Sequence, residues 1–71
     1  MPKSDTIDVR QLRQNLQMSQ PEFAHRFGVN LGTLRQWEQG RRRPDEAARA
    51  LLAVISHSPD IVREALSAAA A

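Results

Sequence analysis

The first helical pattern in the chain carries large apolar side chains on one face. They recur at i, i+3 and i+7, and they are Val9, Leu12 and Leu16. This spacing is typical of an amphipathic α-helix. Thr6 or Asp5 can cap the helix, and Asp8 stands near its positive end. We therefore predict a helix over residues 7–16, preceded by a flexible polar lead over residues 1–6.

Two short helical patterns follow, and each lies between a capping residue and a glycine. Residues 19–22, SQPE, form a capping box with proline in the first turn, and Gly28 suits a left-handed stop. Asn30 can cap the next helix, which Gly40 closes. Because only Val29 and Asn30 separate Gly28 from that helix, the two helices must cross steeply, as in a helix-turn-helix.

The second of these helices, over residues 31–39, has two different faces. Leu34, Trp37 and Glu38 share the face that we expect to be buried. Trp37 stands at core spacing, so we interpret it as packing rather than as a platform for stacking on bases. The opposite face is expected to project into solvent, and it carries Leu31, Gly32, Arg35, Gln36 and Gln39. In the preceding helix, the small side chain of Ala24 lets the two helices approach closely.

Two further helices complete the chain. Asp45 can cap the first, and Ser58 followed by Pro59 starts the second. Their apolar faces carry Ala48, Leu51, Leu52 and Ile55 in the first, and Val62, Ala65, Leu66 and Ala69 in the second. No strand-like alternation occurs. The sequence therefore predicts an all-α fold, a five-helix bundle, in a single domain over residues 7–71.

Composition excludes several classes of protein. The 71 residues include no cysteine, and His25 and His57 have no third ligand at metal spacing, so no metal site is expected. No serine, histidine and acid cluster can be placed in a pocket, so we expect neither an enzyme nor a cofactor. The chain also has no apolar stretch long enough for a membrane span and no signal core. We therefore expect a cytoplasmic, nucleoid-associated protein without membrane contact.

Charge is distributed unevenly. Residues 1–44 contain eight Lys or Arg against four Asp or Glu, whereas residues 45–71 contain two against four. Nine of the ten basic residues are arginine, which forks well onto phosphate oxygens and guanine edges. This asymmetry favours an anionic partner for the first two-thirds of the chain and a different contact for the last third.

One segment resembles a known family. Residues 19–44, SQPEFAHRFGVNLGTLRQWEQGRRRP, resemble the DNA-binding core of the Cro/cI-type (XRE) helix-turn-helix family, to which the lambda repressor belongs. The matching elements are Gln20, Ala24, Gly28, Leu34, Trp37-Glu38 and Gly40. The resemblance implies a lambda-repressor-like fold, double-stranded DNA as partner, and a structural ion pair between Arg13 and Glu38.

The same resemblance implies base reading at four positions, which here are Leu31, Gly32, Thr33 and Gln36. Leucine can contact a thymine methyl, glycine permits close approach, and glutamine can fork onto adenine. We add Arg35, which can reach guanine or a flanking phosphate. Phosphate contacts are expected from Gln20, Gln39, Arg41, Arg42 and Arg43, because they flank this helix or stand at a helix start.

A narrower likeness is to HigA-type antitoxins of toxin–antitoxin modules. LGTLRQWEQGRRRP, an alanine-rich helix and SPDIVREAL are similar to theirs. The likeness implies an antitoxin of a type II module that represses its own operon, with a cognate toxin as a further partner. About six residues precede the first predicted helix. A separate toxin-binding segment then lies outside this chain, or neutralisation uses another surface, or the protein is a plain repressor without a toxin.

Selective binding calls for two copies, since one reading helix covers few base pairs and each mismatch costs only about 1–3 kcal/mol. We expect a homodimer on a palindromic operator with reading helices about 34 Å apart. The predicted interface comprises Leu52, Val54, Ile55, Ile61, Val62, Ala65 and Leu66. Two other functions stay open: a toxin-sequestering module with little DNA binding, and an RNA-binding module, which the three buried-looking aromatics disfavour.

Overall fold

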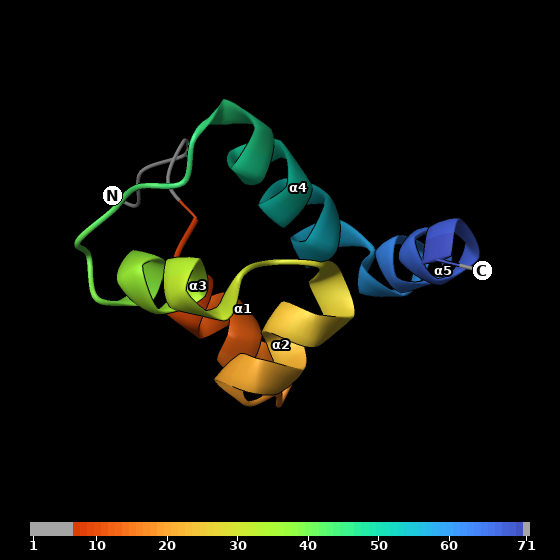
Figure 1. The fold of residues 1–71 in the computed structure, drawn as a ribbon, viewed down its shortest axis with the longest axis horizontal. Helices are drawn as coiled ribbons and strands as arrows, with labels where there is room; N and C mark the ends of the chain where they lie inside the picture. The colour runs from red at the N-terminus through yellow and green to blue at the C-terminus, as the bar shows by residue number, and fades with distance from the viewer. Residues whose placement is uncertain (1–6, 71) are drawn as a thin grey trace.

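A computed structural model of the protein describes residues 7–70, which form five α-helices and no strand. The helices are α1 (Val9–Asn15), α2 (Gln20–Phe27), α3 (Leu31–Glu38), α4 (Glu46–His57) and α5 (Pro59–Ala70). Figure 1 shows α1, α2 and α3 grouped together, with α4 above them and α5 at the far end. The predicted all-α, five-helix fold is confirmed. None of the described helices is long and apolar enough to cross a membrane.

The start of α1 differs from the prediction. Asp8 is its N-cap, and the Asp8 carboxylate accepts a hydrogen bond from the backbone N–H of Gln11 at 3.0 Å. The helix therefore begins at Val9 rather than at residue 7. The two expected caps, Asp5 and Thr6, lie outside the described residues.

The caps of α2 and α3 are those that the sequence predicts. Ser19 Oγ accepts from the Glu22 N–H at 3.2 Å, and the Glu22 carboxylate accepts from the Ser19 N–H at 2.8 Å. Gly28 ends α2 with a φ of 69°, a left-handed conformation that side chains disfavour. Asn30 Oδ1 then accepts from the Thr33 N–H at 3.0 Å. These local bonds fix the short turn between the two helices.

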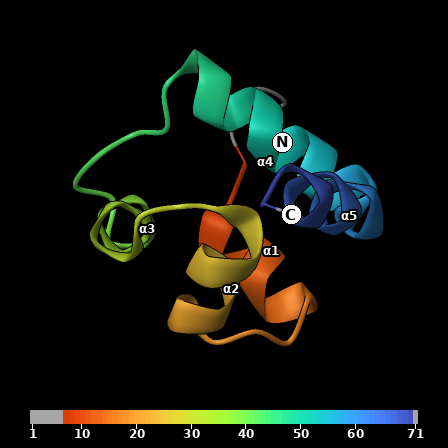
Figure 2. The ribbon, with the colours of Figure 1, turned by 45° about the vertical axis from the view of Figure 1, so that its right-hand side comes forward.

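All five helices contribute buried side chains to the core, and α2 contributes the most. Its fully buried side chains are Phe23, Phe27, Leu34, Leu52 and Ile55. The rings of Phe23 and Phe27 lie 4.8 Å apart at 58°, a tilted arrangement. Helix α3 contacts α1 and α2, while α5 contacts α2 and α4. Both views place α3 and α5 at opposite sides of the molecule, so one flank of α3 stays at the edge of the fold (Figure 2).

Part of the predicted dimer interface is wrong. Leu52, Ile55 and Val62 are buried within the chain, because α4 and α5 pack these side chains against the core. They cannot meet a second copy of the folded protein. The exposed members of the predicted set are Val54, Ala65, Leu66 and Ile61, of which Ile61 is 62% exposed.

Candidate nucleic-acid interface

Helix α3 presents an outward face at the edge of the molecule. Gly32 and Gln36 are exposed on it, while Leu34, on the opposite side, is fully buried and anchors the helix to the core. Arg35 is exposed, and Thr33 is half-buried. Trp37 is half-buried and packs against the core, as predicted.

Leu31 departs from the expected exposed face. Its side chain is half-buried and packs partly against the core. The reason is helical geometry, because residues three apart lie within about 60° of each other, and Leu31 therefore stands close to the side of Leu34. Less of the Leu31 side chain is available to a ligand than the sequence suggested.

The predicted ion pair between Arg13 and Glu38 is present. Arg13 Nε donates to Glu38 Oε2 at 2.6 Å, and Arg13 Nη2 donates to Oε1 at 2.8 Å. The Glu38 side chain is 0% exposed and that of Arg13 is 15% exposed. This bidentate, nearly dry pair joins α1 to the last residue of α3, so it holds the direction of α3 against the rest of the fold.

Three further side chains extend this pair into what we call the Glu38 cluster, comprising Arg10, Arg13, Gln20, Arg35 and Glu38. Gln20 Nε2 donates to Glu38 Oε1 at 3.2 Å, and Arg35 Nε donates to Gln20 Oε1 at 3.3 Å. Arg10 Nε lies 3.5 Å from Glu38 Oε1, and Arg10 Nη2 donates to the Glu38 carbonyl at 3.4 Å. Residues from α1, α2 and α3 thus meet around one carboxylate.

Glu38 carries its charge at neutral pH. The hydrogen bonds from Arg13 lower the pKa of Glu38 below its ordinary value of 4.5, and the Gln20 amide adds to this, although burial opposes both. The same contact raises the pKa of Arg13. Each partner therefore stabilises the charged form of the other.

Gln20 has a different setting from the one predicted. Its amide is engaged with Glu38 and Arg35, and its side chain is half-buried. The start of α2 is also poor in free donors, because the Ser19 and Glu22 amides close the capping box and Pro21 has none. Any anion at this point must be held by side chains rather than by the helix terminus alone.

Besides the Glu38 cluster, a second group of basic side chains follows α3. It is the arginine loop, residues 41–43, and all three residues are exposed. It leaves α3 through Gly40, whose φ is 75°, and the Arg41 N–H donates to the Gln36 carbonyl at 3.0 Å. A hollow of about 330 Å³ lies beside it, lined by Thr33, Trp37, Arg42, Arg43 and Asp45. The loop is therefore held next to one flank of α3, and the exposed Gln39 lies at the junction.

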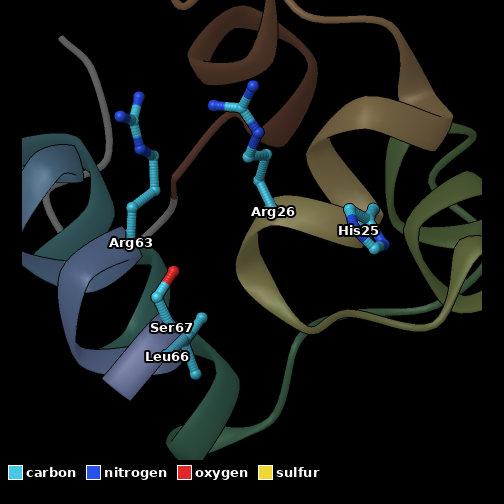
Figure 3. A pocket seen from close by; sticks show the side chains of 5 residues that line it. All are labelled: His25, Arg26, Arg63, Leu66 and Ser67. Atoms are coloured by element: carbon cyan, nitrogen blue, oxygen red, sulfur yellow. The ribbon is translucent and has the colours of Figure 1, made fainter. Parts of the chain in front are cut away.

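A separate hollow of about 530 Å³ lies between α2 and α5, lined by His25, Arg26, Arg63, Leu66 and Ser67. Figure 3 shows Arg26 and Arg63 extending in the same direction from the two helices. No predicted DNA contact lines this hollow. Arg26 and Arg63 are therefore basic residues that lie between α2 and α5 and not beside the outward face of α3.

Sequence reasoning missed Arg10 and the engaged state of Gln20. One signal for Arg10 was available, because it stands three residues before Arg13 and so points to the same side of α1. No local rule indicates the Gln20 contacts, since Gln20 and Glu38 are 18 residues apart. Within the described residues, no group of His, Asp or Glu could hold a metal ion.

Comparison with known proteins bears on this arrangement. The sequence matches the family described as the antitoxin component of a bacterial toxin-antitoxin system, MqsA, over residues 2–66. The chain belongs to the MqsA antitoxin family. No curated protein matches this MqsA-family chain.

A solved structure, that of an HTH XRE-family like protein from Agrobacterium tumefaciens, is similar to the MqsA-family chain with a TM-score of 0.81. The two are 44% identical, and the match covers 83% of this chain and 95% of the other. The resemblance to XRE-type helix-turn-helix proteins and to antitoxins is confirmed. The narrower likeness to HigA-type antitoxins stays a prediction, since the matching family is MqsA.

Proposed function

We propose that this MqsA-family protein is a sequence-specific DNA-binding repressor that inserts α3 into the major groove of a palindromic operator. The observation that carries the proposal is the outward face of α3, where Gly32 and Gln36 are exposed on a helix anchored by Leu34 and Glu38. A major groove about 12 Å wide admits one helix of this kind. A helix held on its inner side and open on its outer side suits that groove.

The residues divide into two roles. Gln36 forks onto adenine, Gly32 lets the first turn approach the base edges, and Thr33 bonds a base or a phosphate. Gln39 and the arginine loop bind backbone phosphates, because they are exposed beside the outward face. Leu31 contributes at most the exposed part of its side chain to a thymine methyl.

The repressor acts as a homodimer in this proposal. Val54 on α4 and Ile61 on α5 are exposed large apolar side chains, and α4 and α5 pack against each other. A second copy covering Val54, Ile61, Ala65 and Leu66 would bury them and pair two reading helices on one face of DNA. Sedimentation of the protein with and without a palindromic duplex tests this, and a monomer in both conditions would refute it.

The test of DNA binding is a competition experiment. A palindromic duplex selected by the protein from a random library is labelled and displaced by random duplex and by single-stranded RNA. Gln36→Ala should weaken binding of the selected duplex by about 1–3 kcal/mol and leave random duplex almost unchanged, whereas Arg42→Ala should weaken both alike. Equal displacement by RNA would refute DNA as the ligand.

Family membership also supports a protein partner. We propose that the partner is a cognate toxin, whose operon this protein represses. Co-expression with the product of the neighbouring reading frame, followed by purification of this chain, tests the proposal. A neighbouring product that neither co-purifies nor harms growth when expressed alone would favour a plain repressor.

A further inference from the structure

Arg35 does not share the outward face of α3. At about 100° per residue, Gly32 and Gln36 lie opposite the buried Leu34, while Arg35 lies at one flank and Thr33 at the other. The arginine loop adjoins the flank of Thr33, since Arg42 and Arg43 line the same hollow as Thr33 and Trp37. The outward face therefore has a basic group on each side, and Arg35 stands on the side away from the loop.

The direction of Arg35 is set by Gln20. The Gln20 amide donates to the ionised Glu38 at 3.2 Å, and this leaves its oxygen as acceptor for Arg35 Nε at 3.3 Å. The reverse amide orientation would place an oxygen against the carboxylate and an NH2 group against the guanidinium, and both contacts are unfavourable. Because Glu38 is buried and charged, it fixes Gln20, and Gln20 fixes Arg35.

Arg10 reaches the same carboxylate oxygen as Gln20, Glu38 Oε1. Its side chain is 54% exposed, and its contacts with Glu38 are long, at 3.5 and 3.4 Å. A guanidinium has five N–H donors, so most of those on Arg10 and Arg35 stay available to a further acceptor. The cluster holds three guanidinium groups and one carboxylate, and Arg13 alone makes the short bidentate pair. An excess of positive charge therefore remains at its exposed edge.

We infer that Arg10 and Arg35 together bind one backbone phosphate of DNA, with Gln20 as the residue that positions Arg35. The inference rests on the proposed function and deepens it. A helix in the major groove lies between two phosphate backbones, and the arginine loop on one flank leaves the other flank to Arg10 and Arg35. Arg35 then contacts phosphate and reads no base.

The first experiment measures how binding of a random 20-base-pair duplex depends on salt between 50 and 200 mM. Each lost phosphate contact should make the slope of log K against log salt less negative by about 0.9 for each bound protomer. Because the two guanidinium groups share one phosphate, Arg10→Ala combined with Arg35→Ala should show this full change, and each single variant should show a smaller change in the same direction. Arg10→Lys, which keeps the charge, should retain the wild-type slope. Arg63→Ala in the hollow between α2 and α5 is the matched control and should retain the wild-type slope (Figure 3). Thermal unfolding of each variant verifies that it is folded.

The second experiment asks what Arg35 contacts and whether Gln20 acts through it. Selection from a random library should return the same consensus for Arg35→Ala as for the wild type, since a phosphate contact carries no sequence information. Gln20→Ala should weaken duplex binding in the wild-type background and cause no further loss when Arg35 is already alanine. A purely structural role of Gln20 would give equal losses in both backgrounds.

Different outcomes would refute the phosphate site and the proposed DNA binding. Unchanged slopes for Arg10→Ala and Arg35→Ala, together with a reduced slope for Arg42→Ala, overturn the phosphate site and leave DNA binding intact. A consensus altered at one base pair by Arg35→Ala assigns Arg35 to base reading and also overturns the inference. No measurable binding of duplex by the wild-type protein would instead refute the proposed function itself.

Discussion

Replacing Glu38 with alanine removes the acceptor around which α1, α2 and α3 meet. Arg13 loses two hydrogen bonds to the carboxylate, at 2.6 and 2.8 Å, and keeps one from Nη1 to the Met18 carbonyl at 2.9 Å. Gln20 Nε2 also loses its acceptor. Since the Arg13 side chain is only 15% exposed, water replaces little of what is lost.

The expected loss of stability follows from this burial. Removing one partner of a buried ion pair costs about 3–5 kcal/mol, because the remaining charge is left uncompensated. The bond to Met18 and the slight exposure of Arg13 place Glu38→Ala at the lower end, about 3 kcal/mol. A domain of this size has a free energy of unfolding of roughly 4–10 kcal/mol, so the variant should retain only about 1–7 kcal/mol.

Urea unfolding monitored by the fluorescence of the single tryptophan, Trp37, measures the effect. With an m-value of about 1 kcal/mol/M, the midpoint should fall by about 3 M. Glu64→Ala, at an exposed position on α5, is the matched control and should change stability by less than about 0.5 kcal/mol. A loss below about 0.5 kcal/mol for Glu38→Ala would mean that the pair is solvated and does not hold the direction of α3.

Three other perturbations test separate parts of the structure. The pKa of Glu38 is lowered by folding, so its contribution to stability is present above pH 4.5 and is lost as pH falls through the lower, folded-state value. Acid titration of the unfolding free energy should therefore show a decline in the wild type that is weaker in Glu38→Gln, and equal curves would contradict it. Gly28→Ala should cost about 1 kcal/mol in urea unfolding, because φ is 69° and the nearest atom to the added carbon is Leu66 Cδ1 at 4.0 Å, so only backbone strain acts. An unchanged free energy of unfolding for Gly28→Ala would show that the left-handed conformation at this position is not strained for alanine. Gly32→Ala should leave stability nearly unchanged, since the gain in helix propensity is offset by a contact of 3.2 Å with the capping Asn30 Oδ1. It should nevertheless weaken duplex binding, and unchanged affinity would show that the first turn of α3 does not approach the bases.

The helices and their caps were predictable because their determinants are local. Ser19 with Glu22, Asn30 with Thr33 and Asp45 with Ala48 each act over three residues. Capping of this kind depends on few neighbours and needs no knowledge of the tertiary fold. The predicted start of α1 was wrong by two residues, because the N-cap of this helix is Asp8.

Burial was harder to predict than helix position. Periodicity places Leu52, Ile55 and Val62 on apolar faces, but it does not say whether the same chain or a second copy covers those faces. For Leu31 the predicted exposure was wrong by less, because a side chain that points about 60° away from the core is partly buried and partly exposed. Such assignments depend on how the helices cross.

The candidate site was predicted only in part, because some of its contacts join residues far apart in the sequence. The pair of Arg13 and Glu38 came from the family resemblance, and the exposed Gly32 and Gln36 from the helical pattern. The contacts of Gln20 and Arg10 with Glu38 join residues 18 and 28 apart, and no spacing rule covers them. They become visible only when three helices are placed in space.

The Glu38 cluster allows the stability of the fold and the orientation of the DNA-contacting side chains to be tested separately. Replacing a buried ion pair with apolar side chains of similar volume is often neutral or stabilising, because desolvation of the charges offsets much of their attraction. Arg13→Met with Glu38→Leu should therefore unfold within about 1 kcal/mol of the wild type. Yet Gln20 then has no charged acceptor, so nothing directs its oxygen at Arg35. The salt slope of duplex binding should become less negative, by less than about 0.9 for each bound protomer, because Arg10 still reaches the phosphate. A double variant as stable as the wild type and with the wild-type slope would show that apolar contacts alone orient α3 and Arg35, and that the carboxylate has no part in binding.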